Sequence, residues 1–132
     1  MTSVNLLKMK KKIKKMQQLK FNQMMPGFRA TGVMHAEFDT DPFLIFGEFY
    51  NDRSVFGPHP HASVSVMTYL LPDSKGSFLN RDSFGDHSII HPGGIHVTQT
   101  GKGIYNDEFP EEREAIVSGR REVPTRWGWY WA

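Results

Sequence analysis

The sequence has 132 residues, a formal net charge of +2 at pH 7 and no cysteine. A chain of this length forms one domain and buries about two-thirds of its unfolded surface, enough for a core without disulfides. The composition excludes a disulfide scaffold, a cysteine-based zinc site and a thiol nucleophile, and the charge is too small to indicate nucleic-acid binding.

Basic residues gather at the N-terminal end. Residues 1–36 contain eight Lys and Arg and no acidic residue, whereas the rest of the chain contains eight basic and 14 acidic residues. Apolar residues at three- and four-residue spacing predict a helix over 5–20. We expect a solvated basic face on an appended helix; a helix that binds a membrane surface or a partner is the alternative. Because neither a secretory signal nor a transmembrane run is present, we predict a cytoplasmic protein.

From residue 28 onward, short β-like runs are separated by turn residues. The clearest is 63–71, where Val66, Thr68 and Leu70 alternate with their neighbours at the period of a strand. Short strands without a helical pattern between them predict an all-β sandwich or barrel. The predicted strands are 29–38, 43–50, 63–71, 76–81, 87–91 and 95–100.

Two segments divide the chain in this interpretation. Residues 1–27 form a basic N-terminal leader, and residues 28–132 form a single β domain with a tail rich in tryptophan. Three tryptophans within residues 127–131 are costly to leave in water. We therefore expect this tail to pack on the barrel or on a second copy of the chain.

The candidate site consists of His59-Pro60-His61 and, further along, Asn106-Asp107-Glu108. Side chains two residues apart on a strand share a face, so each motif can aim two groups at one point. Two histidines and a carboxylate with open positions form the ligand set of non-haem Fe(II) enzymes. A single His-x-His pair is weak evidence, and the alternative is that these are polar surface residues.

The remaining histidines and glycines give weaker signals. His96 is a second-choice ligand, but its apolar neighbours predict that its own side chain points outward. His87 and His91 are interpreted as surface residues of a strand. Gly101-Lys102-Gly103 lacks the third glycine and the helix of a phosphate-binding loop, and is interpreted as a tight turn before the strand of Glu108.

Taken together, these motifs resemble the pirin branch of the cupin superfamily over about residues 41–110. The matching runs occur in the family's order: Asp41-Pro-Phe-Leu44, Phe56-Gly-Pro-His-Pro-His61, Val66-Met-Thr-Tyr-Leu-Leu71, Asn80-Arg-Asp-Ser83, Pro92-Gly93 and Gly101-Lys-Gly-Ile-Tyr-Asn-Asp-Glu108. The resemblance implies a cupin-type double-stranded β-helix, that is, a jelly-roll barrel. It also implies one divalent metal, Fe(II) in the family, with Ni, Mn or Zn as alternatives. The implied ligand positions are His59, His61, Asn106 and Glu108.

The same resemblance implies two functions that differ in class. The first is a dioxygenase-type oxidoreductase acting on a flavonol such as quercetin, with Glu108 as a base that takes a hydroxyl proton. The second is a non-enzymatic regulatory or binding protein with a vestigial site. A barrel that binds a small molecule without metal is a third, weaker reading.

Two departures from the family's pattern bear on this choice. Asn106 stands where the family has histidine, and an amide oxygen is a poorer ligand for Fe(II), which predicts a weak, altered or empty site. The family's proteins have two cupin domains, whereas this chain resembles the N-terminal half. A barrel without its usual neighbouring domain must cover that surface, and we therefore expect a homodimer. A small-molecule substrate is expected as well.

Overall fold

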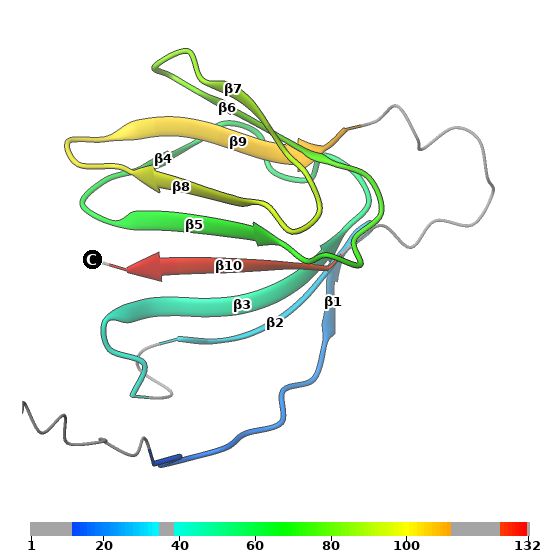
Figure 1. Cartoon of the computed structure of the whole chain (residues 1–132), viewed down its shortest axis with the longest axis vertical. Coiled ribbons are helices and arrows are strands. Elements are labelled where there is room, and N and C mark those ends of the chain that lie inside the picture. Colours follow the sequence, from blue (N-terminus) through cyan, green and yellow to red (C-terminus); the bar gives the residue numbers. More distant parts are fainter. Residues whose placement is uncertain (1–11, 35–38, 112–124, 132) are drawn as a thin grey trace, which may run out of the picture.

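The computed structural model describes residues 12–34, 39–111 and 125–131 (Figure 1). Within these ranges the fold is all-β, with strands arranged in two antiparallel sheets. Thr68 on one sheet hydrogen-bonds Glu108 on the other, so the sheets face each other and enclose an interior. This arrangement confirms the all-β part of the predicted fold.

One sheet has six strands and the other has four. The six-stranded sheet has the order β1 (Asn22–Met25), β2 (Phe28–Met34), β3 (Phe43–Asn51), β10 (Thr125–Trp131), β5 (Ser65–Leu70) and β8 (Ile95–Gln99). The four-stranded sheet has the order β4 (His59–His61), β9 (Ile104–Pro110), β6 (Phe78–Asp82) and β7 (His87–Ile90).

The hydrophobic core lies between the two sheets. Leu70, Phe78 and Ile90 form its centre, and each is at most 4% exposed. Leu70 comes from β5, whereas Phe78 and Ile90 are opposite each other on β6 and β7. Burying side chains of this size stabilises a fold by about 1.5–3 kcal/mol each, so this contact holds the two sheets together.

The alternation seen in the sequence gives β5 its orientation. Along Ser65–Leu70 the side chains of Val66, Thr68 and Leu70 are buried, and those between them are partly exposed. The predicted alternation over 63–71 is therefore confirmed. All six predicted strands are present, with ends that differ by a few residues where the structure describes them; residues 35–38 of the first lie outside the described ranges.

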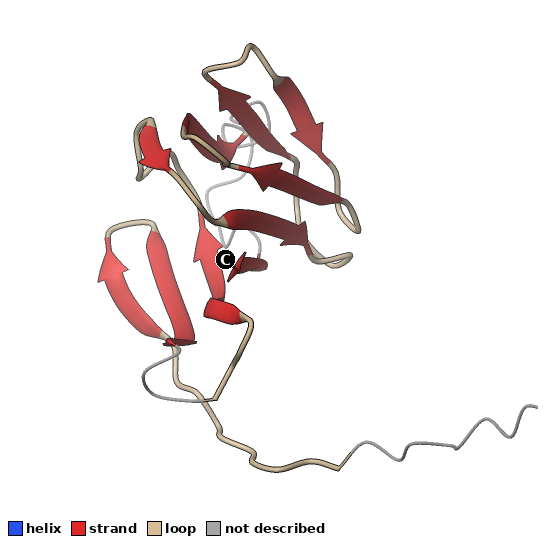
Figure 2. Ribbon diagram, turned by 90° about the vertical axis from the view of Figure 1, so that its left-hand side faces the viewer, coloured by secondary structure: helices blue, strands red, loops and turns tan. Residues whose placement is uncertain are grey.

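The predicted N-terminal helix is wrong over its described part. Residues 12–20 form no helix, and residues 1–11 lie outside the described ranges. Ile13 is 80% exposed and Met16 is 83% exposed, so the apolar stripe has no surface to pack against. A single short helix is marginal in water without such packing. Figure 2 shows this segment leading away from the sheets as an extended loop, and no membrane-spanning helix occurs among the described residues.

Four strands lie outside the six predicted ranges: β4 and β9 carry the two candidate motifs, and β1 and β10, which no motif predicted, belong to the larger sheet. β1 pairs with β2 through the turn Pro26-Gly27, where Gly27 adopts a φ of 80° that favours glycine. β10 is hydrogen-bonded between β3 and β5, as Figure 1 shows. The tail thus joins the barrel as a strand, but the packing of its tryptophan side chains lies outside the described structure.

Candidate metal centre

The two predicted motifs meet as neighbouring strands. β4 pairs with β9 in a register that places His59 opposite Asn106 and His61 opposite Ile104. Directly opposite residues have Cβ atoms about 5 Å apart, so the imidazole and the amide start from adjacent points. Pro60 is tolerated because β4 pairs with β9 alone and lies at the edge of its sheet.

Alternation along β9 separates an inner face from an outer face. Ile104 is 6% exposed and Asn106 is 4% exposed, whereas Tyr105 between them is 58% exposed. Glu108 follows Asn106 on the inner face. The carboxylate therefore enters the interior, and for Glu108 the alternative of a polar surface residue is wrong.

The two histidines of β4 lie side by side, with ring centroids 4.7 Å apart. The Nδ1–H of His59 donates to the carbonyl oxygen of Gly57 at 2.9 Å, which leaves Nε2 as the lone-pair nitrogen. A hydrogen bond of this kind fixes the tautomer and the orientation of metal-binding histidines.

His61 is held in its neutral form by its surroundings. Partial burial lowers its pKa first, the neighbouring His59 lowers it further, and Glu108 acts in the opposite direction. Because metals bind the neutral imidazole, this shift keeps His61 in the form that binds a metal at neutral pH.

Asn106 carries a buried amide oxygen whose bonding capacity is unused. Its Oδ1 accepts no hydrogen bond within the described structure, although the residue is almost fully buried. An unsatisfied buried polar atom costs about 1–3 kcal/mol. A cation bound beside the two imidazoles would satisfy this oxygen, so the residues present fit a divalent metal.

Glu108 is held by two residues of the opposite sheet. Thr68 Oγ1 donates to Glu108 Oε2 at 2.6 Å, and His96 Nδ1 lies 3.3 Å from Glu108 Oε1. The hydrogen bond to Glu108 is the main cause that raises the pKa of His96, against the opposing effect of burial. Both carboxylate oxygens are therefore fixed in direction.

From His96, polar contacts continue to the protein surface. His96 Nε2 lies 3.7 Å from Asp86 Oδ2, which also accepts hydrogen bonds from Ser88 Oγ at 2.7 Å and Asn80 Nδ2 at 2.8 Å. The bond from Ser88, followed by that from Asn80, lowers the pKa of Asp86. A line of polar groups thus connects the interior carboxylate to the turn between β6 and β7.

The predicted orientation of His96 was wrong. Its side chain is 18% exposed and points at Glu108, whereas Ile95 and Val97 are 60% and 49% exposed. Because Ile95 and Val97 are apolar, they were assigned to the buried face of the strand. A one-residue error of this kind places every side chain of the strand on the opposite face. Thr68 is polar on the buried face of its own strand and His96 is its direct partner, a pairing that becomes visible only in the folded structure. His87 and His91 are exposed, as predicted.

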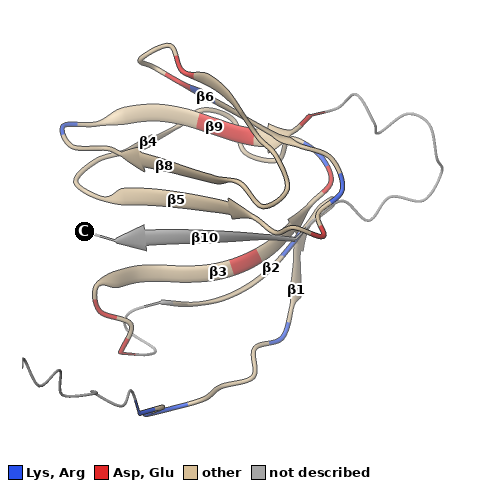
Figure 3. Ribbon diagram, viewed as in Figure 1, with Lys and Arg blue, Asp and Glu red and all other residues tan. Residues whose placement is uncertain are grey.

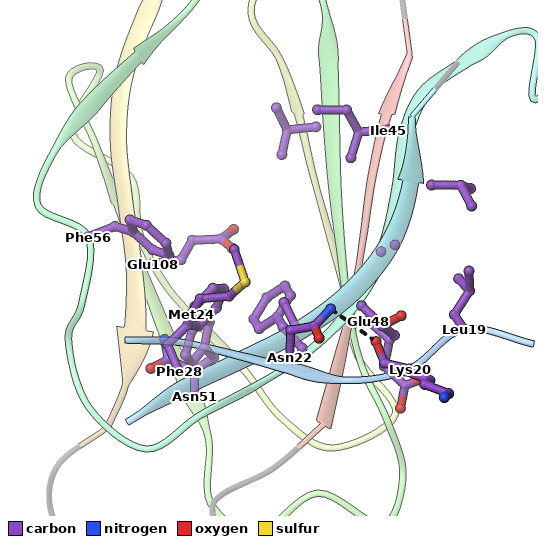
Figure 4. Close-up of a pocket in the computed structure, with 18 of the residues that line it drawn as sticks. Leu19, Lys20, Asn22, Met24, Phe28, Ile45, Glu48, Asn51, Phe56 and Glu108 are labelled. Atoms are coloured by element: carbon purple, nitrogen blue, oxygen red, sulfur yellow. Dashed lines mark hydrogen bonds between the residues drawn. The ribbon is translucent and has the colours of Figure 1, made fainter. Parts of the chain in front are cut away.

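The four predicted ligand residues line one open pocket of about 1100 Å³. In Figure 4, Phe28, Phe56 and Met24 lie near Glu108, while Leu19, Lys20 and Glu48 lie at the far side. No three His, Asp or Glu side chains in the described ranges are close enough to form a complete metal cluster. The arrangement instead offers two imidazoles, one amide oxygen and a carboxylate that is already hydrogen-bonded.

Figure 3 shows how charge is distributed around this pocket. Acidic residues lie on β9 and β3, and basic residues mark the N-terminal segment that leaves the sheets. Burial raises the pKa of Glu48 on β3, and Asp73 adds to the effect. Glu108 and Glu48 thus both line the pocket, and Lys20 lies at the same side as Glu48.

The amino-acid sequence matches the family model described as Pirin over residues 9–122. A pirin-like protein of Caulobacter vibrioides is 36% identical over 84 residues, which make up 60% of this chain and 29% of that protein. The chain thus spans less than a third of that relative's length.

Several solved structures share the fold. A Geobacillus kaustophilus protein superposes with a TM-score of 0.74 at 22% identity, covering 91% of this chain and 45% of that one. A quercetin 2,3-dioxygenase of Acinetobacter baumannii gives 0.64 at 18% identity, covering 85% and 40%. A bacterial pirin of Escherichia coli in complex with nickel(II) gives 0.59 at 17% identity, covering 85% and 46%. At these identities the likeness concerns the fold alone.

Proposed function

We propose that this chain, which belongs to the pirin family, is a metal-dependent cupin that oxidises a flavonol-like substrate. The observation that carries the proposal is the placement of His59 opposite Asn106, whose buried amide oxygen lacks a partner. Quercetin oxidation by a structural neighbour and nickel binding by another support it.

In this proposal His59, His61, Asn106 and Glu108 hold one divalent cation. Fe(II) is the first candidate, and Ni(II), Mn(II) and Zn(II) are the alternatives. Imidazole suits the later transition metals, whereas amide and carboxylate oxygens suit harder cations, so this mixed set binds less selectively than one with a third histidine. When bound, the metal would supply Lewis acidity and a place for oxygen chemistry.

The protein's own groups would orient and deprotonate the substrate. Glu108 lines the pocket as a carboxylate and is the base we assign to a substrate hydroxyl. Thr68 and His96 fix the direction of its two oxygens, which reduces the reorganisation needed when the proton moves.

Aromatic side chains would shield this chemistry from water. Phe28 contacts Phe49 at 5.7 Å and Phe56 at 5.0 Å between ring centroids, and Phe56 lies 6.4 Å from His59. The three phenylalanines line the pocket beside the histidines. They give an aromatic substrate a surface to pack against and lower the local polarity around the base.

Two features of the candidate metal site favour a second function. The oxygens of Glu108 already accept hydrogen bonds, and Asn106 offers a neutral amide in place of an imidazole. A protein with this weakened site could serve as a non-enzymatic regulatory or binding protein. In this function the metal, if bound, would adjust the shape of the pocket.

Metal analysis on protein purified without a metal-affinity tag tests the proposal. His59→Ala and His61→Ala should each lower bound metal by at least roughly tenfold, since losing a ligand costs no less than losing its support. His87→Ala, an exposed histidine on β7, is the matched control and should keep full occupancy. Measurement of oxygen uptake in the presence of quercetin then distinguishes the enzymatic function from the non-enzymatic binding function. Full metal retention in both ligand variants would refute the assignment.

A further inference from the structure

A short basic segment, residues 12–16, lies outside both sheets and has the sequence Lys-Ile-Lys-Lys-Met. All five residues are exposed, the segment forms no regular secondary structure, and none of its residues lines the pocket. Figures 2 and 3 show it in the part of the chain that leads away from the sheets and carries basic residues. The core and the candidate metal centre therefore leave the basic segment without a role.

Two apolar side chains of the basic segment are exposed to an unusual degree. Ile13 is 80% exposed and Met16 is 83% exposed, and only Phe84, at 81%, is comparable among the large apolar side chains of the described ranges. The others are 60% exposed or less. Because removing such side chains from water is favourable, the segment keeps apolar surface available for a partner.

The charge of the chain restricts this partner to an anionic one. Lys12 and Lys14 form no ion pair within the described ranges, and no acidic residue precedes Glu37 in the sequence. Residues 37–132 contain 14 acidic and eight basic residues, so an anionic surface that attracts the segment repels the rest of the chain. Such a surface would therefore meet the basic segment first.

The mixture of lysine and apolar residues favours a lipid surface over a nucleic acid. At an anionic bilayer, lysine ammonium groups stay among the headgroups while apolar side chains enter the boundary of the acyl chains. A nucleic-acid backbone would pair with Lys12 and Lys14 but would leave Ile13 and Met16 in water. The segment also contains no arginine and no aromatic residue, the side chains that most often contact bases.

We propose that the basic segment docks the protein on an anionic lipid surface, with Lys12 and Lys14 among the headgroups and Ile13 and Met16 at the boundary of the acyl chains. A lysine near such a surface strengthens binding about fivefold, so the contact is reversible and sensitive to salt. The docking needs neither the metal nor the pocket and is separate from the proposed oxidation of a flavonol-like substrate.

Sedimentation of the full chain with vesicles tests the role of charge. Vesicles of equal parts phosphatidylcholine and phosphatidylserine should bind the protein at least roughly tenfold more tightly than vesicles of phosphatidylcholine alone. Lys12→Gln combined with Lys14→Gln should weaken binding to the acidic vesicles by at least roughly tenfold. Lys75→Gln combined with Lys102→Gln is the matched control, because both lysines are exposed and lie between strands, and it should leave binding unchanged.

A second pair of substitutions tests the role of the apolar side chains at constant charge. Ile13→Ser combined with Met16→Ser should weaken binding to the acidic vesicles by at least roughly tenfold, because two side chains no longer leave water. Phe84→Ser, which removes an equally exposed apolar side chain between β6 and β7, should leave binding unchanged. All of these positions lie outside the strands, so thermal unfolding should give one midpoint for every variant.

Equal binding to the two kinds of vesicle, or unchanged binding in either variant of the basic segment, would overturn the proposal. An equal loss in the Lys75–Lys102 or Phe84 control would overturn it as well, since the contact would then not belong to this segment. Tighter binding to a DNA duplex than to the acidic vesicles would assign the segment to nucleic acid instead.

Discussion

The Nδ1 atom of His96 lies 3.3 Å from the Oε1 atom of Glu108, and this contact joins the edge strand of one sheet to the inner face of the other. Thr68 approaches the second oxygen of the same carboxylate. Glu108 therefore serves as a bridge between the sheets as well as a candidate ligand and base. For this reason, a substitution of His96 should be tested for its effect on both the stability of the fold and metal binding.

The stability contributed by His96 should depend on pH. Its folded pKa is raised, mainly by the hydrogen bond to Glu108, with Asp86 and Asp82 acting in the same direction. The folded state thus holds this proton more tightly than the unfolded state, in which the reference pKa is about 6.5. The contribution is full below that value and is lost as pH rises through the folded pKa.

Thermal unfolding of the native chain and of His96→Gln measures this effect. The difference in midpoint between the two should be larger at about pH 6 than at about pH 9. Glutamine can still donate a hydrogen bond to Glu108 but does not gain a charge. A difference that grows toward high pH would have the wrong sign and would contradict the assignment.

Replacing Asn106 by histidine should strengthen metal binding. An imidazole at this position adds a third nitrogen beside His59 and His61, and nitrogen ligands favour Fe(II), Ni(II) and Zn(II) over an amide oxygen. Ni(II) titration of the native chain and of Asn106→His measures the gain, which we expect to be at least roughly tenfold, comparable to the effect of a supporting group. Unchanged affinity would show that residue 106 does not reach the metal. Asn106→Asp is a control that adds a negative charge at this position without adding an imidazole.

Truncation of the core should be far more costly than truncation of the outer face. Leu70 is fully buried between the sheets, so Leu70→Ala should destabilise the fold by about 2–5 kcal/mol. Ile89 on β7 is 46% exposed, and Ile89→Ala should cost well under half as much. Urea unfolding of both variants gives the two values. Similar losses would mean that the outer face of β7 is covered in solution.

Removing residues 1–20 should leave the folded domain intact. Within that range residues 12–20 form no regular structure, and β1 begins at Asn22. The thermal midpoint should change by no more than about 4 °C, which corresponds to roughly 1 kcal/mol for a domain of this size. A larger drop would assign this segment a structural role. Since Leu19 and Lys20 line the pocket, ligand affinity should be measured on the same protein.

The parts of the fold that could be predicted from the sequence are those governed by local patterns. Alternation in 63–71 identified the inner face of β5, and the two-residue spacing of His59 and His61 placed them on a shared face. The resemblance to pirins then brought Asn106 and Glu108 to the same site, and the β4–β9 register agrees.

The parts that could not be predicted depend on long-range pairing. The phase of β8 followed from its pairing with β5, which puts His96 beside Thr68, and the apolar residues around His96 gave the opposite answer. β10 also lacks a local signal for its place, because its neighbours in space are distant in sequence. Propensity could not reveal that Ile13 and Met16 have nothing to pack against.

The position of β10 has a consequence for how the protein is made. β3 and β5 are joined in the sheet through β10, so before residues 125–131 leave the ribosome the larger sheet exists as two separate ribbons. Each ribbon then presents an unpaired strand edge to solvent, which is a template for association with other chains. Such closure by a distant segment is slow compared with local pairing. The nascent chain therefore passes through an interval in which both edges are open to association with other chains.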